Sequence, residues 1–387
     1  KFYSVLPSSG VGDFDFTRSG GATRINSQGL IETVADGVSR LNYPLIDGKV
    51  VGCPSHLLEP QSTNAINYSE DFSNSAWSKS NSTITNDNAI SPNGTLNADK
   101  LVENAVSSTH WIREVVSVSN GKVTFSIFAK KGERNFLVIR ENTLGGKFFD
   151  LSNGTINSDF NATLVDDAKI ESYGNGWYKC SITVTVSTSS ADFLIYVTNE
   201  DGVTNYQGDG TSGIYIWGAM VEQGSFPTSY IPTNGSQTTR SAETANGAGD
   251  ASTFNDSEGV LMAEGSLLDV SQNFNKISIS DGSSAENRIE IIYLNDNEIK
   301  IELGLTNGFN EVLNVGSSES FNKIAVVYNS TNASVFINGF NLVTNTMSSL
   351  NGLSQLQFNR FNSNVENFHG SIKQLQYFDS ALNDSDL

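Results

Sequence analysis

Apolar and polar residues alternate in short runs along this chain, and the pattern predicts β-strands. In the segment 122–130, Val123, Phe125 and Ile127 fall on one side of an extended backbone and Thr124 falls on the other. A two-residue period of this kind is typical of a strand with one buried face. The same pattern recurs in the segments 177–186, 192–198, 214–222, 289–294, 298–305, 323–329 and 333–339. Because turn-forming clusters separate these runs and sustained helical periodicity is lacking, we expect an all-β fold built of sandwiches.

Breaks in this rhythm divide the chain into four parts. Residues 1–62 show little sustained alternation, and we expect them to form a short irregular segment wrapped on its neighbour. Residues 63–235 form a strand-rich block with the size of one jelly-roll sandwich. The stretch 236–255 has almost no large apolar residue, which favours a linker or exposed loop, and residues 256–387 form a second sandwich. The predicted architecture is two tandem β-sandwich (jelly-roll) domains after a short irregular N-terminal segment.

Charge and composition narrow the classes of partner. The chain of 387 residues has 23 Lys and Arg against 42 Asp and Glu, a formal charge of −19. Phosphate backbones would repel such a chain, so we expect no nucleic-acid partner. No run of about 20 apolar residues is present, so we expect no membrane insertion. The first residues, KFYSVLPSSG, lack a Met and the pattern of a signal peptide, so we expect that upstream sequence is missing.

Several stretches resemble one known family. They are FDFTRSGGATRINSQGLIETV (14–34), CPSHLLEPQSTNAINYSEDFSNSAW (53–77), GDGTSGIYIWGAMVEQGSFPTSYIPT (208–233) and TTRSAE (238–243). Together they resemble the signature of a recurrent family of phage tail and virion proteins, which carry "FTR…ATR.N", "LLEP..TN…SEDF" and "WGA..E.G.FPTSYIPT" motifs. Met220 stands where that family usually has Gln. The resemblance implies a structural protein of the virion surface or tail fibre.

The two predicted sandwiches carry resemblances of their own. VVYNSTNASVFINGF (326–340) and FHGSIKQLQYFDSALNDSDL (368–387) resemble the central hairpin and the final strand of a concanavalin A-like (laminin G-like) domain. The block 64–222 resembles the carbohydrate-binding jelly-rolls attached to glycan-degrading enzymes. These likenesses imply adhesion to a host surface polysaccharide, next to other virion proteins and as a homo-oligomer, with a homotrimer common among fibres. A virion protein of this kind folds in the host cytoplasm and leaves by lysis.

Two alternatives stay open. The chain could consist of the carbohydrate-binding modules of a secreted glycan-degrading enzyme, or it could be a ligand-free spacer or decoration protein of the virion. No catalytic motif such as G-x-S-x-G or H-E-x-x-H occurs, and the chain is not expected to be an enzyme. No cofactor is indicated, although calcium held by loop oxygens, for example at 199–201 or Asp281, is compatible with the sequence.

Aromatic side chains are the candidate ligand-binding residues. Trp and Tyr rings on β-sandwiches stack against the apolar faces of sugars. The candidates are Trp77, Trp111, Trp177 and Tyr206. Trp177 lies opposite the apolar side of its predicted strand, a position that is compatible with exposure. For each ring, a place in the core is favoured over stacking on a ligand.

Overall fold

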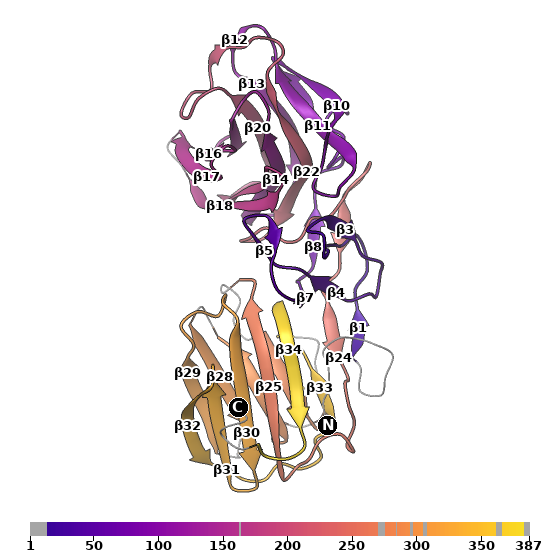
Figure 1. Cartoon of the computed structure of the whole chain (residues 1–387), viewed down its shortest axis with the longest axis vertical. Helices are drawn as coiled ribbons and strands as arrows, with labels where there is room; N and C mark the ends of the chain where they lie inside the picture. The colour runs from indigo at the N-terminus through magenta and orange to yellow at the C-terminus, as the bar shows by residue number, and fades with distance from the viewer. Residues whose placement is uncertain are drawn as a thin grey trace.

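Two β-sandwiches lie one above the other along the long axis of the computed structural model, and parts of the N-terminal segment lie between them (Figure 1). The structure describes residues 14–161, 164–269, 275–283, 285–294, 297–304, 308–360 and 366–382. All regular structure in these residues is β, which confirms the predicted fold class. Within the same ranges, no helix has the length and apolar character needed to cross a membrane.

The first sandwich is made of two six-stranded antiparallel sheets. One sheet has the strand order β10 (Ser82–Ile90), β11 (Leu96–Glu103), β22 (Gly213–Gln223), β14 (Gly121–Lys131), β19 (Trp177–Val186) and β18 (Val165–Gly174). The other has the order β17 (Thr155–Phe160), β16 (Gly145–Asp150), β15 (Phe136–Glu141), β20 (Ser190–Thr198), β13 (His110–Ser117) and β9 (Ser78–Ser80). A small pair, β12 (Ser107–Ser108) with β21 (Tyr206–Gln207), lies beside them.

The core of this sandwich follows the alternation in the sequence. Val123, Phe125 and Ile127 of β14 are fully buried between the sheets, as their spacing predicts. Cys180 and Ile182 of β19 join the same core. Burial raises the pKa of the Cys180 thiol well above its ordinary value, so the thiol behaves as a small apolar group.

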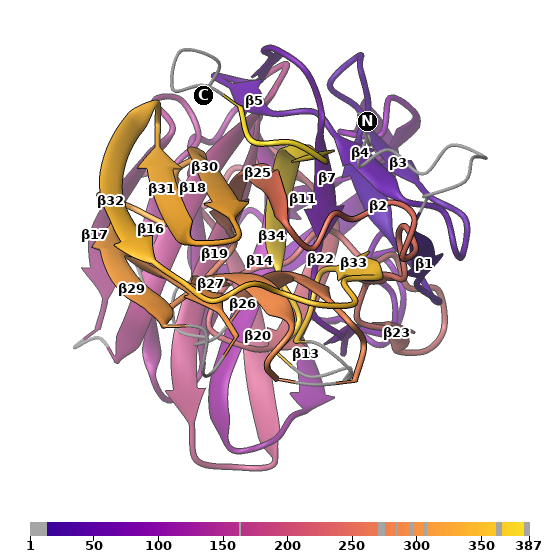
Figure 2. The same ribbon diagram turned by 90° about the horizontal axis from the view of Figure 1, so that it is seen from below.

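The second sandwich uses strands from both ends of the chain. Its seven-stranded sheet has the order β32 (Phe340–Thr346), β31 (Asn332–Ile337), β30 (Asn322–Asn329), β25 (Glu258–Leu267), β34 (Gly370–Phe378), β7 (Ser55–Leu58) and β4 (Arg40–Asn42). Its five-stranded sheet has the order β29 (Phe309–Asn314), β28 (Glu298–Leu303), β27 (Arg288–Tyr293), β26 (Asn275–Ser280) and β33 (Gln355–Gln357). Figure 2 shows β7 beside β34, so the N-terminal segment extends the sheet of the distant sandwich.

The stretch 236–255 differs from the expected linker or exposed loop. It contains β23 (Thr238–Arg240), which pairs with β8 (Ser62–Asn64), and β24 (Thr244–Asn246), which pairs with β1 (Asp15–Thr17). The buried side chains in this stretch are Arg240, Glu243, Ala245, Ala248, Thr253 and Phe254. Low apolar content suggested exposure, but small and charged side chains fill this region because they pair with the N-terminal segment. That segment also contains two hairpins, β2 (Thr23–Ile25) with β3 (Ile31–Thr33) and β5 (Leu45–Ile46) with β6 (Lys49–Val50).

Candidate functional site

Three of the four candidate rings are buried in the first sandwich. Trp77 is 1% exposed, Trp177 is 2% exposed and Tyr206 is 7% exposed. The expectation that these rings stack on a ligand at the surface is therefore corrected. Trp177 is covered because the outer face of its sheet packs against residues of other segments, among them Ile31 and Tyr230.

The polar atoms of the buried rings are satisfied inside the protein. The indole nitrogen of Trp177 donates to the backbone oxygen of Ile90 at 2.9 Å. The indole nitrogen of Trp77 donates to the backbone oxygen of Tyr68 at 2.9 Å. Tyr206 donates its hydroxyl to a carboxylate oxygen of Glu103 at 2.6 Å. Rings with both faces packed and their donors occupied are structural side chains.

Trp111 is the candidate that remains accessible. It is half-buried and lies on β13, facing away from the core. Cross-strand partners share one face of a sheet, and here the row runs from Trp111 to Tyr196 on β20, then to Val138 on β15 and Phe148 on β16. These four side chains form a cluster separate from the core.

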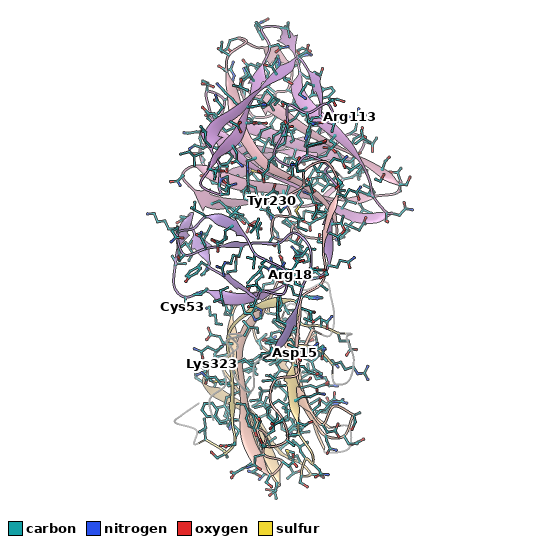
Figure 3. All side chains as sticks on the ribbon, turned by 90° about the vertical axis from the view of Figure 1, so that its right-hand side faces the viewer. Asp15, Arg18, Cys53, Arg113, Tyr230 and Lys323 are labelled. Carbon is teal, nitrogen blue, oxygen red and sulfur yellow. The ribbon has the colours of Figure 1, made fainter. Side chains whose placement is uncertain are left out.

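Arginines follow the aromatic row on the same face. The next row runs from Arg113 on β13 through Leu194 and Arg140 to Gly146 on β16, and ends at Phe160 on β17. We call the outward side of the sheet from β17 to β9, with these two rows, the open face. Figure 3 labels Arg113 on the first sandwich, far from Arg18 and Tyr230, which lie towards the second sandwich.

Contacts on the open face bring guanidinium groups next to aromatic rings. The Arg140 guanidinium carbon lies 4.4 Å from the centre of the Phe160 ring, and its Nη1 donates to the Tyr196 hydroxyl at 3.3 Å. A Cβ on Gly146 would lie 2.5 Å from the Cβ of Arg140, so glycine is needed for this approach. Nη1 of Arg113 lies 3.5 Å from a carboxylate oxygen of Asp192. Val138, Phe148, Leu194 and Tyr196 are at most 5% exposed, so the accessible part of the open face consists of two partly exposed rings, Trp111 and Phe160, with Arg113 and Arg140 beside them.

The open face could have been found in the sequence. In HWIREVV (110–116), the alternate positions 111, 113 and 115 carry Trp, Arg and Val, opposite the buried Ile112 and Val116. The outward-facing positions of this strand carry aromatic, basic and aliphatic residues in turn. In an ordinary sandwich strand the outward-facing positions are polar.

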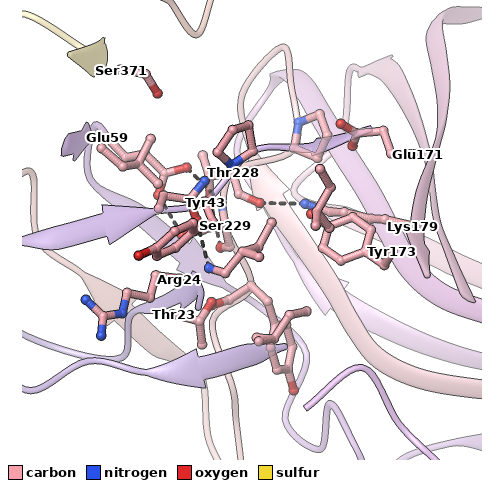
Figure 4. Close-up of a pocket in the computed structure, with 18 of the residues that line it drawn as sticks. Thr23, Arg24, Tyr43, Glu59, Glu171, Tyr173, Lys179, Thr228, Ser229 and Ser371 are labelled. Carbon is pink, nitrogen blue, oxygen red and sulfur yellow. Dashed lines mark hydrogen bonds between the residues drawn. The ribbon is translucent and has the colours of Figure 1, made fainter. Parts of the chain in front are cut away.

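A pocket of about 530 Å³ lies between the two sandwiches (Figure 4). Its walls come from three parts of the chain. The N-terminal segment contributes Tyr43, the first sandwich contributes Tyr173 and Lys179, and the second sandwich contributes Leu268 and Ser371. Its volume lies in the range of small-molecule sites.

Next to this pocket is a buried ionic cluster. Arg40 donates to carboxylate oxygens of Glu59 at 2.8 Å and Glu243 at 2.7 Å, and Arg240 lies 2.9 Å from Glu59. Arg18 lies 3.3 Å from Glu243. Although burial alone favours the neutral acid, the guanidinium groups of Arg240 and Arg40 hold the pKa of Glu59 well below its ordinary value.

The same cluster accounts for several of the family-like motifs. Arg18 belongs to FTR, Glu59 to LLEP, and Arg240 and Glu243 to TTRSAE. Ser229, from FPTSYIPT, donates its hydroxyl to Glu59 at 2.6 Å. These motifs, far apart in the sequence, meet at the junction of the sandwiches, where their role is structural.

Calcium binding stays a prediction. Asp201 accepts hydrogen bonds from the backbone and hydroxyl of Ser158 at 3.2 and 2.8 Å. Asp281 accepts from Ser283 at 2.8 Å and from Asn287 at 3.0 Å. Among the residues with a described position, no group of three or more His, Cys, Asp and Glu side chains is arranged to hold a metal ion.

Residues 267–387 match the family model Laminin_G_3, the concanavalin A-like lectin/glucanases superfamily. The second sandwich is a concanavalin A-like domain. No curated protein matches the sequence significantly. The phage tail family suggested by the N-terminal motifs remains a prediction.

The solved structures that resemble this chain have low sequence identity to it. The CBM40 of the Ruminococcus gnavus IT-sialidase, bound to α2,3 sialyllactose, is 17% identical, with 37% of this chain and 91% of that chain covered and a TM-score of 0.31. Domain 4 of AbnA, an arabinanase of Geobacillus stearothermophilus, is 12% identical, with 37% and 70% covered and a TM-score of 0.28. Domains LG4-5 of the mouse laminin α1 chain are 12% identical, with 72% and 90% covered and a TM-score of 0.26. Likenesses this distant say nothing about what this chain binds.

Among the described residues of the concanavalin A-like domain, the most exposed aromatic ring lies on the edge strand β32. Phe340 is 72% exposed and Leu342 is 47% exposed. The strand carries no charged residue, and its outer edge has no pairing strand among the described residues. Phe340 lies on a different sandwich from the open face and provides a matched control for it.

Proposed function

We propose that this chain is a non-enzymatic adhesion protein of a phage virion surface or tail fibre, and that it binds host surface polysaccharide through the open face. The observation that carries the proposal is the two rows on that face, where Trp111 and Phe160 are half-buried rings and Arg113 and Arg140 lie beside them. The match of the second sandwich to a lectin and glucanase superfamily supports a role in carbohydrate binding.

The physical basis is stacking combined with directed hydrogen bonds. The apolar side of a pyranose packs on an indole ring, and a guanidinium donates to hydroxyl or carboxylate oxygens of the sugar. A shallow face of this kind gives weak single contacts. Several copies on one particle, as in a homotrimeric fibre, would multiply them into firm adhesion.

A glycan array with the wild-type chain and Trp111→Ala tests the binding site. We expect the wild type to bind at least one bacterial surface polysaccharide and Trp111→Ala to bind it at least about tenfold more weakly, because the stacking surface is removed. Phe340→Ala removes a more exposed ring from the other sandwich and should bind like the wild type. Absence of binding in the wild type would favour a ligand-free spacer. Equal binding by all three proteins would show that the polysaccharide binds away from the open face.

The virion assignment has a separate test. The complete open reading frame and its neighbouring genes distinguish a virion protein from a secreted enzyme. Tail or capsid genes on either side would support our proposal. A signal peptide with a catalytic domain in the same reading frame would overturn it in favour of carbohydrate-binding modules.

A further inference from the structure

The pocket between the sandwiches contains a buried cation with unused hydrogen-bonding capacity. Lys179 on β19 is only 4% exposed and lines the pocket. Its ammonium donates to the backbone oxygen of Thr228 at 2.7 Å, as Figure 4 shows. An ammonium has three N–H donors, so two remain for other partners. Among the described residues, no carboxylate oxygen lies within 4 Å of the Lys179 nitrogen.

The acidic side chains around Lys179 are occupied by other groups. Glu59 is bound by Arg40 and Arg240. Glu222, whose charge Lys179 stabilises, accepts hydrogen bonds from Ser62 at 2.6 Å and from Thr228 at 2.7 and 2.9 Å. Glu222 acts on Lys179 only through space, and without a carboxylate in direct contact the burial of this ammonium is only partly compensated. The site is therefore suited to an anion supplied from outside.

The remaining walls are suited to a hydroxyl-bearing ring. Tyr43 of the N-terminal segment and Tyr173 of β18 both line the pocket. Burial raises the pKa of Tyr173, so its hydroxyl stays protonated at neutral pH and can donate. Ser371 contributes a hydroxyl group from the second sandwich. Glu171 also lines the pocket and is exposed to solvent.

We propose that this pocket binds a small sugar acid, with the carboxylate at the Lys179 ammonium and the sugar hydroxyls toward Tyr43 and Tyr173. The site is distinct from the open face, and the two proposals can fail independently. Because the walls belong to both sandwiches, a bound sugar acid also stabilises their relative position, as any ligand specific to the folded state does.

Isothermal titration calorimetry on the full chain tests this site, with glucuronate, glucose and inorganic phosphate as probes. We expect glucuronate to bind at one site, at least about tenfold more tightly than glucose, which lacks the carboxylate, or phosphate, which lacks the ring. Lys179→Met keeps the length of the side chain and removes the charge, and should weaken glucuronate binding at least about tenfold. Phe340→Ala should bind within about twofold of the wild type.

Tyr43→Ala keeps the test informative if Lys179→Met folds poorly. Tyr43 is half-buried at the pocket wall, and its loss should weaken glucuronate binding at least about threefold with circular dichroism unchanged. Undetectable glucuronate binding to the wild type, or equal binding by folded Lys179→Met, would overturn the proposal. Phosphate binding as tight as glucuronate binding would overturn the assignment to a sugar acid.

Discussion

The two outer faces of the first sandwich start from similar strands and end in opposite environments. On the sheet with β19 and β22, the outward side chains include Trp177 and Trp217, and both are at most 2% exposed. On the sheet with β13 and β20, the outward side chains include Trp111, which is half-buried, and Val115, which is 49% exposed. We call the first the covered face, in contrast to the open face.

The difference between the faces comes from segments outside the sheets. Ile31 from the N-terminal segment and Tyr230 and Ile231 from the chain after β22 pack on the covered face. The open face has its own rings and Arg140 as its outer layer. One face of the sandwich therefore attaches it to the rest of the chain, and the described residues that pack on the other face all belong to that sheet itself.

The largest expected effect is on the covered face. Trp177→Ala should lower the free energy of unfolding by about 3–5 kcal/mol, because a fully packed indole and its hydrogen bond are lost. Trp111→Ala should cost no more than about 1–2 kcal/mol, because this ring is half-buried. Urea denaturation of both variants measures the difference. Equal losses would show that the two faces are packed alike.

Protonation of a histidine at the junction comes next. Neither ring nitrogen of the buried His56 has a partner among the described residues, and burial, with the charge of Arg40, lowers its pKa to about 4. In the unfolded chain the imidazole of His56 has a pKa near 6.5, so it binds a proton more readily than in the folded protein. The free energy of unfolding therefore falls as the pH decreases from about 6.5 to 4. His56 then costs about 3 kcal/mol at pH 4 relative to pH 7.

His56→Phe should remove this part of the pH dependence, since Phe16 and Phe358 already surround the site. Urea denaturation at pH 4, 5, 6 and 7 gives the profile. An unchanged slope in the variant would assign the pH dependence to other groups.

A smaller effect is expected at the buried ionic cluster. The cluster has three arginines against two glutamates, and Arg40→Met leaves Arg18 and Arg240 to balance Glu59 and Glu243, so the charges then cancel, but several hydrogen bonds are lost. We expect a loss of about 2–3 kcal/mol in thermal or urea unfolding. A gain in stability would show that the apolar replacement outweighs the ion pairs.

The smallest effect should come from the open face away from the rings. Val115→Ser changes a side chain that is 49% exposed, and stability should change by no more than about 0.5 kcal/mol. Glycan binding should stay within about twofold of the wild type. A tenfold loss of binding would extend the site beyond the aromatic and arginine rows.

Local alternation was sufficient to predict the strands and the inner faces. Val123, Phe125 and Ile127 are buried as their spacing requires. Alternation alone does not determine which outer faces are covered. Ser181 and Thr183 alternate with the core residues Cys180 and Ile182 of β19, yet they too are buried, at 3% and 2% exposed, and Thr183 donates its hydroxyl to the backbone oxygen of Ser225.

The site was predicted only in part for the same reason. Trp111 and Trp177 have similar sequence surroundings, and their exposure depends on whether a distant segment lies over them. The pocket could not be predicted, because Tyr43, Lys179 and Ser371 come from three parts of the chain.

The pairing of β7 with β34 has a consequence for the order of events during synthesis. His56 pairs with Ile372, so strands about 300 residues apart must meet before the seven-stranded sheet is complete. The first of these strands leaves the ribosome long before the last, and β4 and β7 stay without β34 until that strand has been synthesised. Pairings of such long sequence separation form slowly. We therefore expect the first sandwich to form on the nascent chain before the seven-stranded sheet of the second sandwich is complete.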